Sequence, residues 1–141
     1  MHLVSRSTLE LLNRKPAERG TAPLPMNRFR PNIVIDGWDE PHTEERVHGL
    51  TIGTAELGYA KLAIRCAVTL AAQESGERSG PEPLRTLAGY RRARPGQSRL
   101  RHEVLRAPDR PGRRGDAVTV TSWGESELHA SDGSPRILTP R

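Results

Sequence analysis

Cys66 is the only cysteine in this chain of 141 residues. It follows Arg65 at the end of the short apolar run "YAKLAI" and precedes a polar segment broken by Gly and Pro. A lone thiol excludes an internal disulfide, and the alternatives for Cys66 are a small buried apolar side chain and a reactive thiolate. The guanidinium of Arg65 would favour a thiolate. Neighbours in a strand point to opposite faces, however, so this pair alone does not decide between the alternatives.

A second candidate is the segment "RFRPN", residues 28–32. Arg28, Arg30 and Asn32 alternate, so in an extended segment they lie on one side. Such a row of donors can hold an anionic or heteroatom-rich ligand by charge-assisted hydrogen bonds. The alternative interpretation is an ordinary exposed strand edge.

The other residues that could catalyse a reaction or bind a ligand form no familiar site. The five histidines share no metal-ligand spacing with each other or with Cys66, which argues against zinc; they are His2, His42, His48, His102 and His129. The chain contains no phosphate-binding glycine loop and no G-x-S-x-G nucleophile elbow. We expect Glu44 and Glu45 on a solvated face.

Composition favours one small domain with modest burial, because only 34% of the residues are hydrophobic and 4% are aromatic. Thirteen Gly and twelve Pro predict many turns and few long helices. No N-terminal signal is recognisable, and no stretch approaches the roughly 18 apolar residues that cross a membrane. With one cysteine, these features predict a soluble, cytoplasmic chain without a membrane partner.

Positive charge is concentrated between Arg85 and Arg114, where ten Arg stand against Glu103 and Asp109. Such a segment could bind an anion or nucleic acid. Tyr90 is its only aromatic residue, and Pro and Gly interrupt it. We therefore expect a loop-rich solvated face rather than a groove-binding helix, and no nucleic-acid partner.

The coarse pattern predicts a mainly β (α+β) domain, open or barrel-like, with short helices. "SRSTLELLNRK" reads as a helix with a Ser7–Glu10 capping box, ended by Pro16. Leu84, Leu87 and Tyr90 mark a second helix within residues 81–92. Strands are expected at 33–35, 66–70, 102–107 and 117–121, with a hairpin around Gly53. Residues 1–124 form the expected domain, and 125–141 a disordered tail.

Five segments, in order, resemble a known family. They are "RFRPNIVIDG", "AIRC", "TLAAQESG", "EPLRTLAGYR" and "RRGDAVTV". The chain resembles the MOSC domain, named for the C-terminal part of molybdenum cofactor sulfurases, in the branch of the amidoxime-reducing components and their bacterial relatives. That branch carries RFRPN, C-x-R-C, T-T-V-D-x-x-T-G, EPL-x-T-L-x-x-YR and V-G-D-x-V. The resemblance spans about residues 2–121 and implies a MOSC-type β-barrel.

The resemblance also assigns site residues. Cys66 occupies the second cysteine of C-x-R-C, which implies the catalytic thiolate ligand of molybdenum in a molybdenum cofactor (molybdopterin). Arg30 and Asn32 match cofactor-contacting positions, and Arg28 and Arg65 match supports. Ser5 is a weaker match to a pterin or phosphate contact. Pyridoxal phosphate binding is associated with the family as well, without a residue in this chain to carry it.

Several positions depart from the family pattern. The family's first cysteine, "KP", "V-D" and "F-G" are replaced in this chain by Ala63, Lys61-Leu62, Ala71-Ala72 and Leu100-Arg101. The family's N-terminal half, which helps to close the cofactor site, is also missing. We expect that it is supplied by a separate chain or is lacking altogether.

The implied function is reduction of N-hydroxylated or N-oxide small molecules, with electrons from a ferredoxin-like, cytochrome or flavin reductase partner. One alternative is a sulfur carrier or sulfurtransferase that uses a Cys66 persulfide. Another is a truncated remnant without catalysis.

Overall fold

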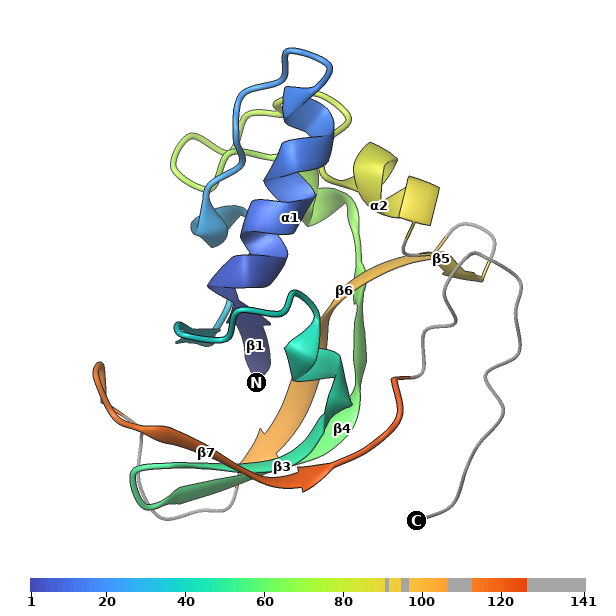
Figure 1. Ribbon diagram of the computed structural model, residues 1–141. Helices are drawn as coiled ribbons and strands as arrows, with labels where there is room; N and C mark the ends of the chain where they lie inside the picture. Colours follow the sequence, from blue (N-terminus) through green and yellow to red (C-terminus); the bar gives the residue numbers. More distant parts are fainter. Residues whose placement is uncertain (91, 95–96, 107–112, 127–141) are drawn as a thin grey trace.

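A computed structural model describes residues 1–90, 92–94, 97–106 and 113–126 (Figure 1). The elements in chain order are β1 (His2–Ser5), α1 (Arg6–Ala17), the 3-10 helix η1 (Met26–Phe29), β2 (Ile33–Ile35), the 3-10 helix η2 (Thr43–Arg46), β3 (Val47–Ile52), β4 (Ala55–Arg65), the 3-10 helix η3 (Ala67–Leu70), α2 (Leu84–Tyr90), β5 (Arg92–Arg94), β6 (Gln97–Arg106) and β7 (Val118–Trp123).

One twisted sheet contains all the described strands, in the order β2-β1-β6-β4-β3-β7, with β5 paired to β6. β1 and β2 are parallel, and the other pairs are antiparallel. The long strands β4 and β6 run from the helices at the top of Figure 1 to β3 and β7 at the bottom. In the described part of the chain the path ends at β2 and β7. The expected closed barrel is therefore not confirmed, whereas the mixture of strands and short helices is.

The apolar interior consists of two clusters at the two ends of these long strands. The sheet core contains buried side chains of β1 to β4: Leu3, Ile35, Val47, Leu50, Ile52 and Leu57. The helix core lies under α1, η1 and α2: Leu12, Leu24, Phe29 and Leu87. The chain thus divides its limited apolar content between the sheet and the helices.

The first helix begins two residues earlier than the predicted capping box. Ser5 is the N-cap, and its hydroxyl oxygen accepts from the Thr8 amide at 3.2 Å. Ser7 is therefore already helical. Pro16 lies in the last turn rather than beyond it, and the helix ends at Ala17. The preceding residues 2–5, which the pattern missed, form strand β1.

Most predicted elements are confirmed. β2 coincides with residues 33–35, β7 covers most of 117–121, and β3 and β4 form the hairpin around Gly53. α2 lies within 81–92. The strand predicted at 66–70 is wrong, because η3 is there.

The basic segment is less loop-rich than predicted. It contributes α2 and the ten-residue strand β6 to the fold, so that part of the prediction is wrong. Residues 91, 95–96 and 107–112 of the segment lie outside the described residues, as do residues 127–141 of the predicted tail. No helix within the described residues is long and apolar enough to cross a membrane.

Candidate functional site

Cys66 is exposed and stands where β4 ends and η3 begins. Its carbonyl accepts two hydrogen bonds from Thr69, one from the amide at 3.2 Å and one from the hydroxyl at 2.9 Å. A hydroxyl that bonds to a backbone carbonyl three residues back competes with strand pairing. Cys66 itself keeps an extended backbone and the chain turns directly after it, so the exposed thiol stands at the junction of β4 and η3.

Arg28 and Arg30 do not share one side, contrary to the extended interpretation of "RFRPN". Arg28 belongs to η1 and is only 6% exposed, whereas Arg30 is exposed. Arg30 ends η1 in a left-handed conformation, with φ of 48°. This turn directs the two guanidinium-bearing residues to different environments, one internal and one at the surface.

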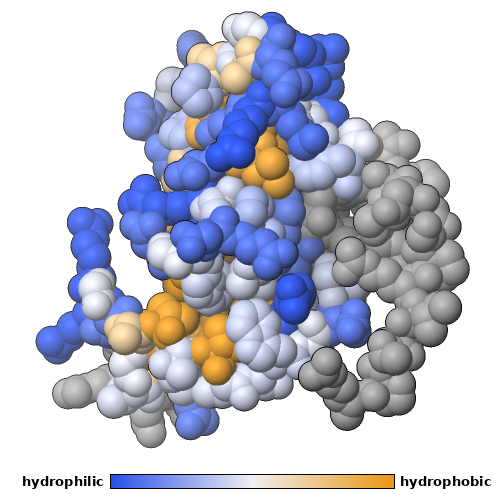
Figure 2. Space-filling model, viewed as in Figure 1, coloured by the Kyte–Doolittle hydropathy of each residue, from blue (hydrophilic) through white to orange (hydrophobic). Residues whose placement is uncertain are grey.

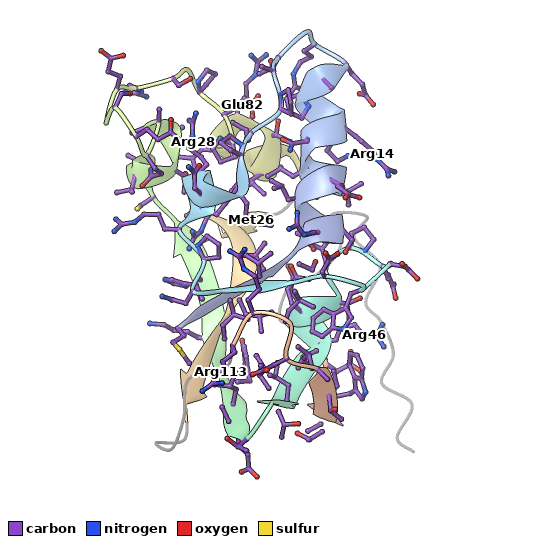
Figure 3. The ribbon with its side chains drawn as sticks, turned by 90° about the vertical axis from the view of Figure 1, so that its left-hand side faces the viewer. Arg14, Met26, Arg28, Arg46, Glu82 and Arg113 are labelled. Atoms are coloured by element: carbon purple, nitrogen blue, oxygen red, sulfur yellow. The ribbon has the colours of Figure 1, made fainter. Side chains whose placement is uncertain are left out.

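Two buried arginines connect η1 to the segment that carries the thiol; we call Arg28 and Arg65 the arginine clamp. Nη1 of Arg28 donates to the carbonyls of Thr69 at 3.5 Å and Leu70 at 3.2 Å. Nη1 of Arg65 donates in the opposite direction, to the Phe29 carbonyl at 3.5 Å. The bonds are reciprocal, so η1 and η3 are held side by side. Figure 3 shows Arg28 in the same half of the molecule as Glu82 and far from Arg113.

Asn32 is exposed but engaged in the fold. Its side-chain oxygen accepts from the His2 amide at 2.9 Å, and its own amide donates to the His2 carbonyl at 2.9 Å. These bonds align β1 with the start of β2. The side-chain nitrogen is then the group that Asn32 can direct toward a ligand.

Ser5 is fully buried, at 0% exposure, and its contacts are internal. Its hydroxyl donates to Glu44 Oε2 at 2.9 Å, and its amide donates to Glu44 Oε1 at 3.3 Å. The structure brings Cys66 together with the arginine clamp and with the segment that ends in Arg30. It places Ser5 at the base of α1, within a separate set of contacts.

Glu44 and Glu45, which we call the acid pair, were expected on a solvated face, and this is wrong. They are 0% and 3% exposed. Glu45 Oε1 lies 3.5 Å from His42 Nδ1, and its Oε2 accepts from the Ser126 hydroxyl at 3.1 Å. The partners Ser5 and Ser126 lie 39 and 81 residues away from their carboxylates. Short-range patterns carry no signal of such contacts.

Tyr90 lies between the helix core and His42, which neighbours the acid pair. Its ring packs against the helix core, and the ring centroid is 6.1 Å from that of His42. Nζ of Lys15 is 4.7 Å from the ring centroid. Burial raises the pKa of Tyr90 to about 12. This phenol therefore stays protonated over the physiological range.

Comparison with known proteins identifies the family of this chain. A family model described as the MOSC domain matches residues 1–119. The chain belongs to the MOSC domain family. Human mitochondrial amidoxime-reducing component 1 is 35% identical over 98 residues, which are 70% of this chain and 28% of that protein. Molybdenum cofactor sulfurase of Arabidopsis thaliana is 33% identical over 99 residues, which are 65% of this chain and 12% of that protein.

The MOSC assignment confirms the family that the motif order indicated, including its relation to the amidoxime-reducing components. The chain spans less than a third of the length of these relatives. In the described part of this MOSC domain, no three His, Cys, Asp or Glu side chains gather into a metal-binding group. The roles assigned to Cys66, Arg30, Asn32, Arg28, Arg65 and Ser5 stay predictions.

Proposed function

We propose that this MOSC domain binds the molybdenum cofactor through the Cys66 thiolate and reduces N-hydroxylated or N-oxide small molecules. The observation that carries the proposal is one exposed thiol at the junction of β4 and η3, next to the buried Arg65. The relatives include proteins named as amidoxime-reducing and as molybdenum cofactor sulfurase. The resemblance of "AIRC" to the C-x-R-C segment of the family supports Cys66 as the proposed metal ligand.

The residues fit such a cofactor in their chemistry. A thiolate is a soft ligand that suits molybdenum, and the sulfur atoms of the pterin can supply the other soft ligands that the chain lacks. Arg30 is exposed at the end of η1 and suits the anionic groups of the cofactor. The arginine clamp would act from beneath by fixing both segments. When bound, the cofactor supplies two-electron, oxygen-atom chemistry, while the chain supplies position and charge.

The fit is incomplete at two predicted contacts. Ser5 is buried and engaged with Glu44, so it can contribute only if the start of α1 moves. Asn32 can contribute only its side-chain nitrogen, because its oxygen is bonded to His2. We therefore assign the main binding role to Cys66 and Arg30. Pyridoxal phosphate binding stays a prediction without a residue to support it.

Partners follow from the proposed reaction. Reduction of an N–OH group consumes two electrons and two protons and releases water, so an electron-donor protein is required; a ferredoxin-like, cytochrome or flavin reductase would serve. A separate chain that supplies the remainder of the relatives' length belongs to the same proposal. We propose cytoplasmic location as well, although the human relative is named as mitochondrial.

The decisive experiment measures molybdenum per chain after expression in a host that makes the cofactor. Cys66→Ser should lower molybdenum at least about tenfold, because a hydroxyl is a poor soft-metal ligand. The melting temperature should hardly change, because the thiol is exposed. Val68→Ser is the matched control, since Val68 is a 46% exposed residue of η3. Equal molybdenum in Cys66→Ser and wild type would reject the ligand role.

The exposed thiol and the sulfurase relative also favour a second candidate, a sulfur carrier that holds a persulfide on Cys66. Intact mass should then show one added sulfur atom that cyanide removes and that Cys66→Ser lacks. A reductase should instead oxidise a reduced viologen when an aromatic amidoxime is added. A folded chain with neither molybdenum nor persulfide would be the non-catalytic remnant.

A further inference from the structure

β7 is an edge strand without the usual protection of an edge. It is the last strand of the sheet path and pairs only with β3 among the described residues (Figure 1). Its sequence "VTVTSW" contains no charged residue, no Pro and no Gly. Natural edge strands usually carry such residues, or bulges, to prevent pairing with another chain. The irregularities in the β3–β7 register lie at the Ser122 end, whereas Val118–Val120 pair regularly.

The side chains of β7 present a surface of the kind that accepts another strand. Val118 and Val120 are partly buried against the sheet core, whereas Thr119 and Thr121 are exposed. Trp123 is 56% exposed at the end of the strand. Exposed aromatic residues of this kind often anchor protein contacts. Figure 2 shows apolar atoms at the surface in the lower half of the molecule, over the sheet that β7 ends.

The other edge of the sheet, strand β2, is shorter and better protected than β7. β2 has only three residues, and Pro31 lies shortly before it and Asp36 directly after it. Proline removes a donor, and a charge resists burial in a strand pair. A partner strand therefore has a longer and less protected site at β7 than at β2.

Charges on either side of β7 indicate which partner fits. Arg113 and Arg114 lie before the strand and Glu125 lies after it, and all three are exposed. The half-buried Asp116 also precedes the strand, where its carboxylate accepts from the Arg113 amide at 2.7 Å, so the end before β7 keeps a net charge of +1 over residues 113–117. When two copies of the strand pair antiparallel about a two-fold axis, the basic end of each copy meets the acidic end of the other. A different protein would match these charges only by chance, whereas a second copy matches them by symmetry.

We propose that β7 pairs antiparallel with β7 of a second copy, so that two MOSC sheets join into one. If the valines of both copies stay on the core side, each even-numbered residue of one β7 must face an even-numbered residue of the other. With Val120 on the axis, Thr119 faces Thr121 of the other copy and Arg114 lies next to its Glu125. One strand pair buries less than a standard interface of about 1,200–2,000 Å². We therefore expect a weak dimer, with a dissociation constant on the order of tens of micromolar.

Sedimentation equilibrium of the full chain tests this from about 2 to 200 µM, where mass action should convert monomer to dimer. Thr119→Lys/Thr121→Lys places lysines directly opposite each other across the axis and should weaken the dimer about 100-fold or more. Val34→Lys/Ser79→Lys adds the same charge at exposed positions away from β7 and should leave the dimer unchanged.

A charge exchange tests the register. Arg114→Glu or Glu125→Arg alone should raise the dissociation constant about three- to tenfold, and the two together should restore it. A chain that is monomeric throughout the range overturns the proposal. A dimer that survives the β7 lysines, or is lost with Val34→Lys/Ser79→Lys, also overturns it. If a purified second protein, and no second copy, binds in a way that the β7 lysines abolish, the edge has a different occupant and the proposal fails.

Discussion

The acid pair and the arginine clamp both bury charged side chains in or near 3-10 helices. They differ in the groups with which these side chains form hydrogen bonds. Glu44 and Glu45 accept from donors that are themselves buried or half-buried, such as the amide and hydroxyl of Ser5. Arg28 and Arg65 donate to backbone carbonyls of η3 and η1, and η3 directly follows the exposed Cys66. Buried charge therefore has a different role in each region. The acid pair fixes where α1 starts, and the clamp fixes the position of a thiol at the surface.

The largest effect is expected at the acid pair. Glu44→Ala leaves the buried Ser5 amide without its acceptor and leaves the Ser5 hydroxyl only Thr8 Oγ1 at 2.8 Å, which should lower the free energy of unfolding by about 2–3 kcal/mol. Glu44→Gln keeps one acceptor and should cost less. Urea unfolding measures both changes, with the exposed Glu10→Ala on α1 as the control. If Glu44→Ala unfolds at the wild-type urea concentration, the acid pair does not hold α1.

Tyr90, which neighbours His42 beside the acid pair, should make the free energy of unfolding decrease at high pH. Its pKa is 10.0 in the unfolded chain and about 12 in the fold. Between these values only the unfolded chain ionises, so the free energy of unfolding should fall by up to about 2 kcal/mol as pH rises from 10 to 12. Below pH 10 this contribution is fully present.

Comparison of wild type with Tyr90→Phe isolates this effect, because other groups also titrate at high pH. Urea unfolding at a series of pH values should show that the difference in stability between the two proteins changes only in the alkaline range. At neutral pH the variant should be no less stable, because the buried hydroxyl of Tyr90 has no hydrogen-bond partner among the described residues. Tyr59→Phe, which removes the hydroxyl of a different tyrosine, is the control for the pH dependence assigned to Tyr90. A constant difference between wild type and Tyr90→Phe would contradict the prediction.

Substitution in the arginine clamp should change stability less than substitution in the acid pair, and should mainly change molybdenum content. Arg28→Met loses bonds to two carbonyls but also removes a buried charge, so stability should fall by only about 1 kcal/mol. Molybdenum per folded chain should fall about tenfold, because η1 and η3 are no longer held together; this change corresponds to about 1.4 kcal/mol of binding. The exposed Arg14→Met on α1 should change neither quantity. Loss of stability without loss of molybdenum would make the clamp a folding device only.

The difference between the two regions also explains which features could be predicted from sequence. Strand residues 33–35, the hairpin around Gly53 and both helices follow from local periodicity and turn residues, and all were confirmed. The site roles of Cys66 and Arg30 follow from motif order and stay predictions. The 3-10 turn at Cys66 was missed because it depends partly on Arg28, which bonds to Leu70 42 residues away. Burial of Glu44 was missed for the same reason, since its partner is at the start of the chain.

The smallest effect tests whether stability and the thiol site can be separated. Gly89 lies in α2, and a Cβ added there meets no atom within 4 Å. Because glycine costs entropy in a helix, Gly89→Ala should raise the free energy of unfolding by about 0.5–1 kcal/mol. The arginine clamp is unchanged in this variant, so molybdenum per chain should stay at the wild-type value.

Gly124→Ala is the contrasting change, because its Cβ would collide with the His48 ring and should destabilise the fold. If Gly89→Ala stabilised the fold and also raised molybdenum, the site would be limited by stability of the whole domain, and the arginine clamp would have no separate role in holding the cofactor.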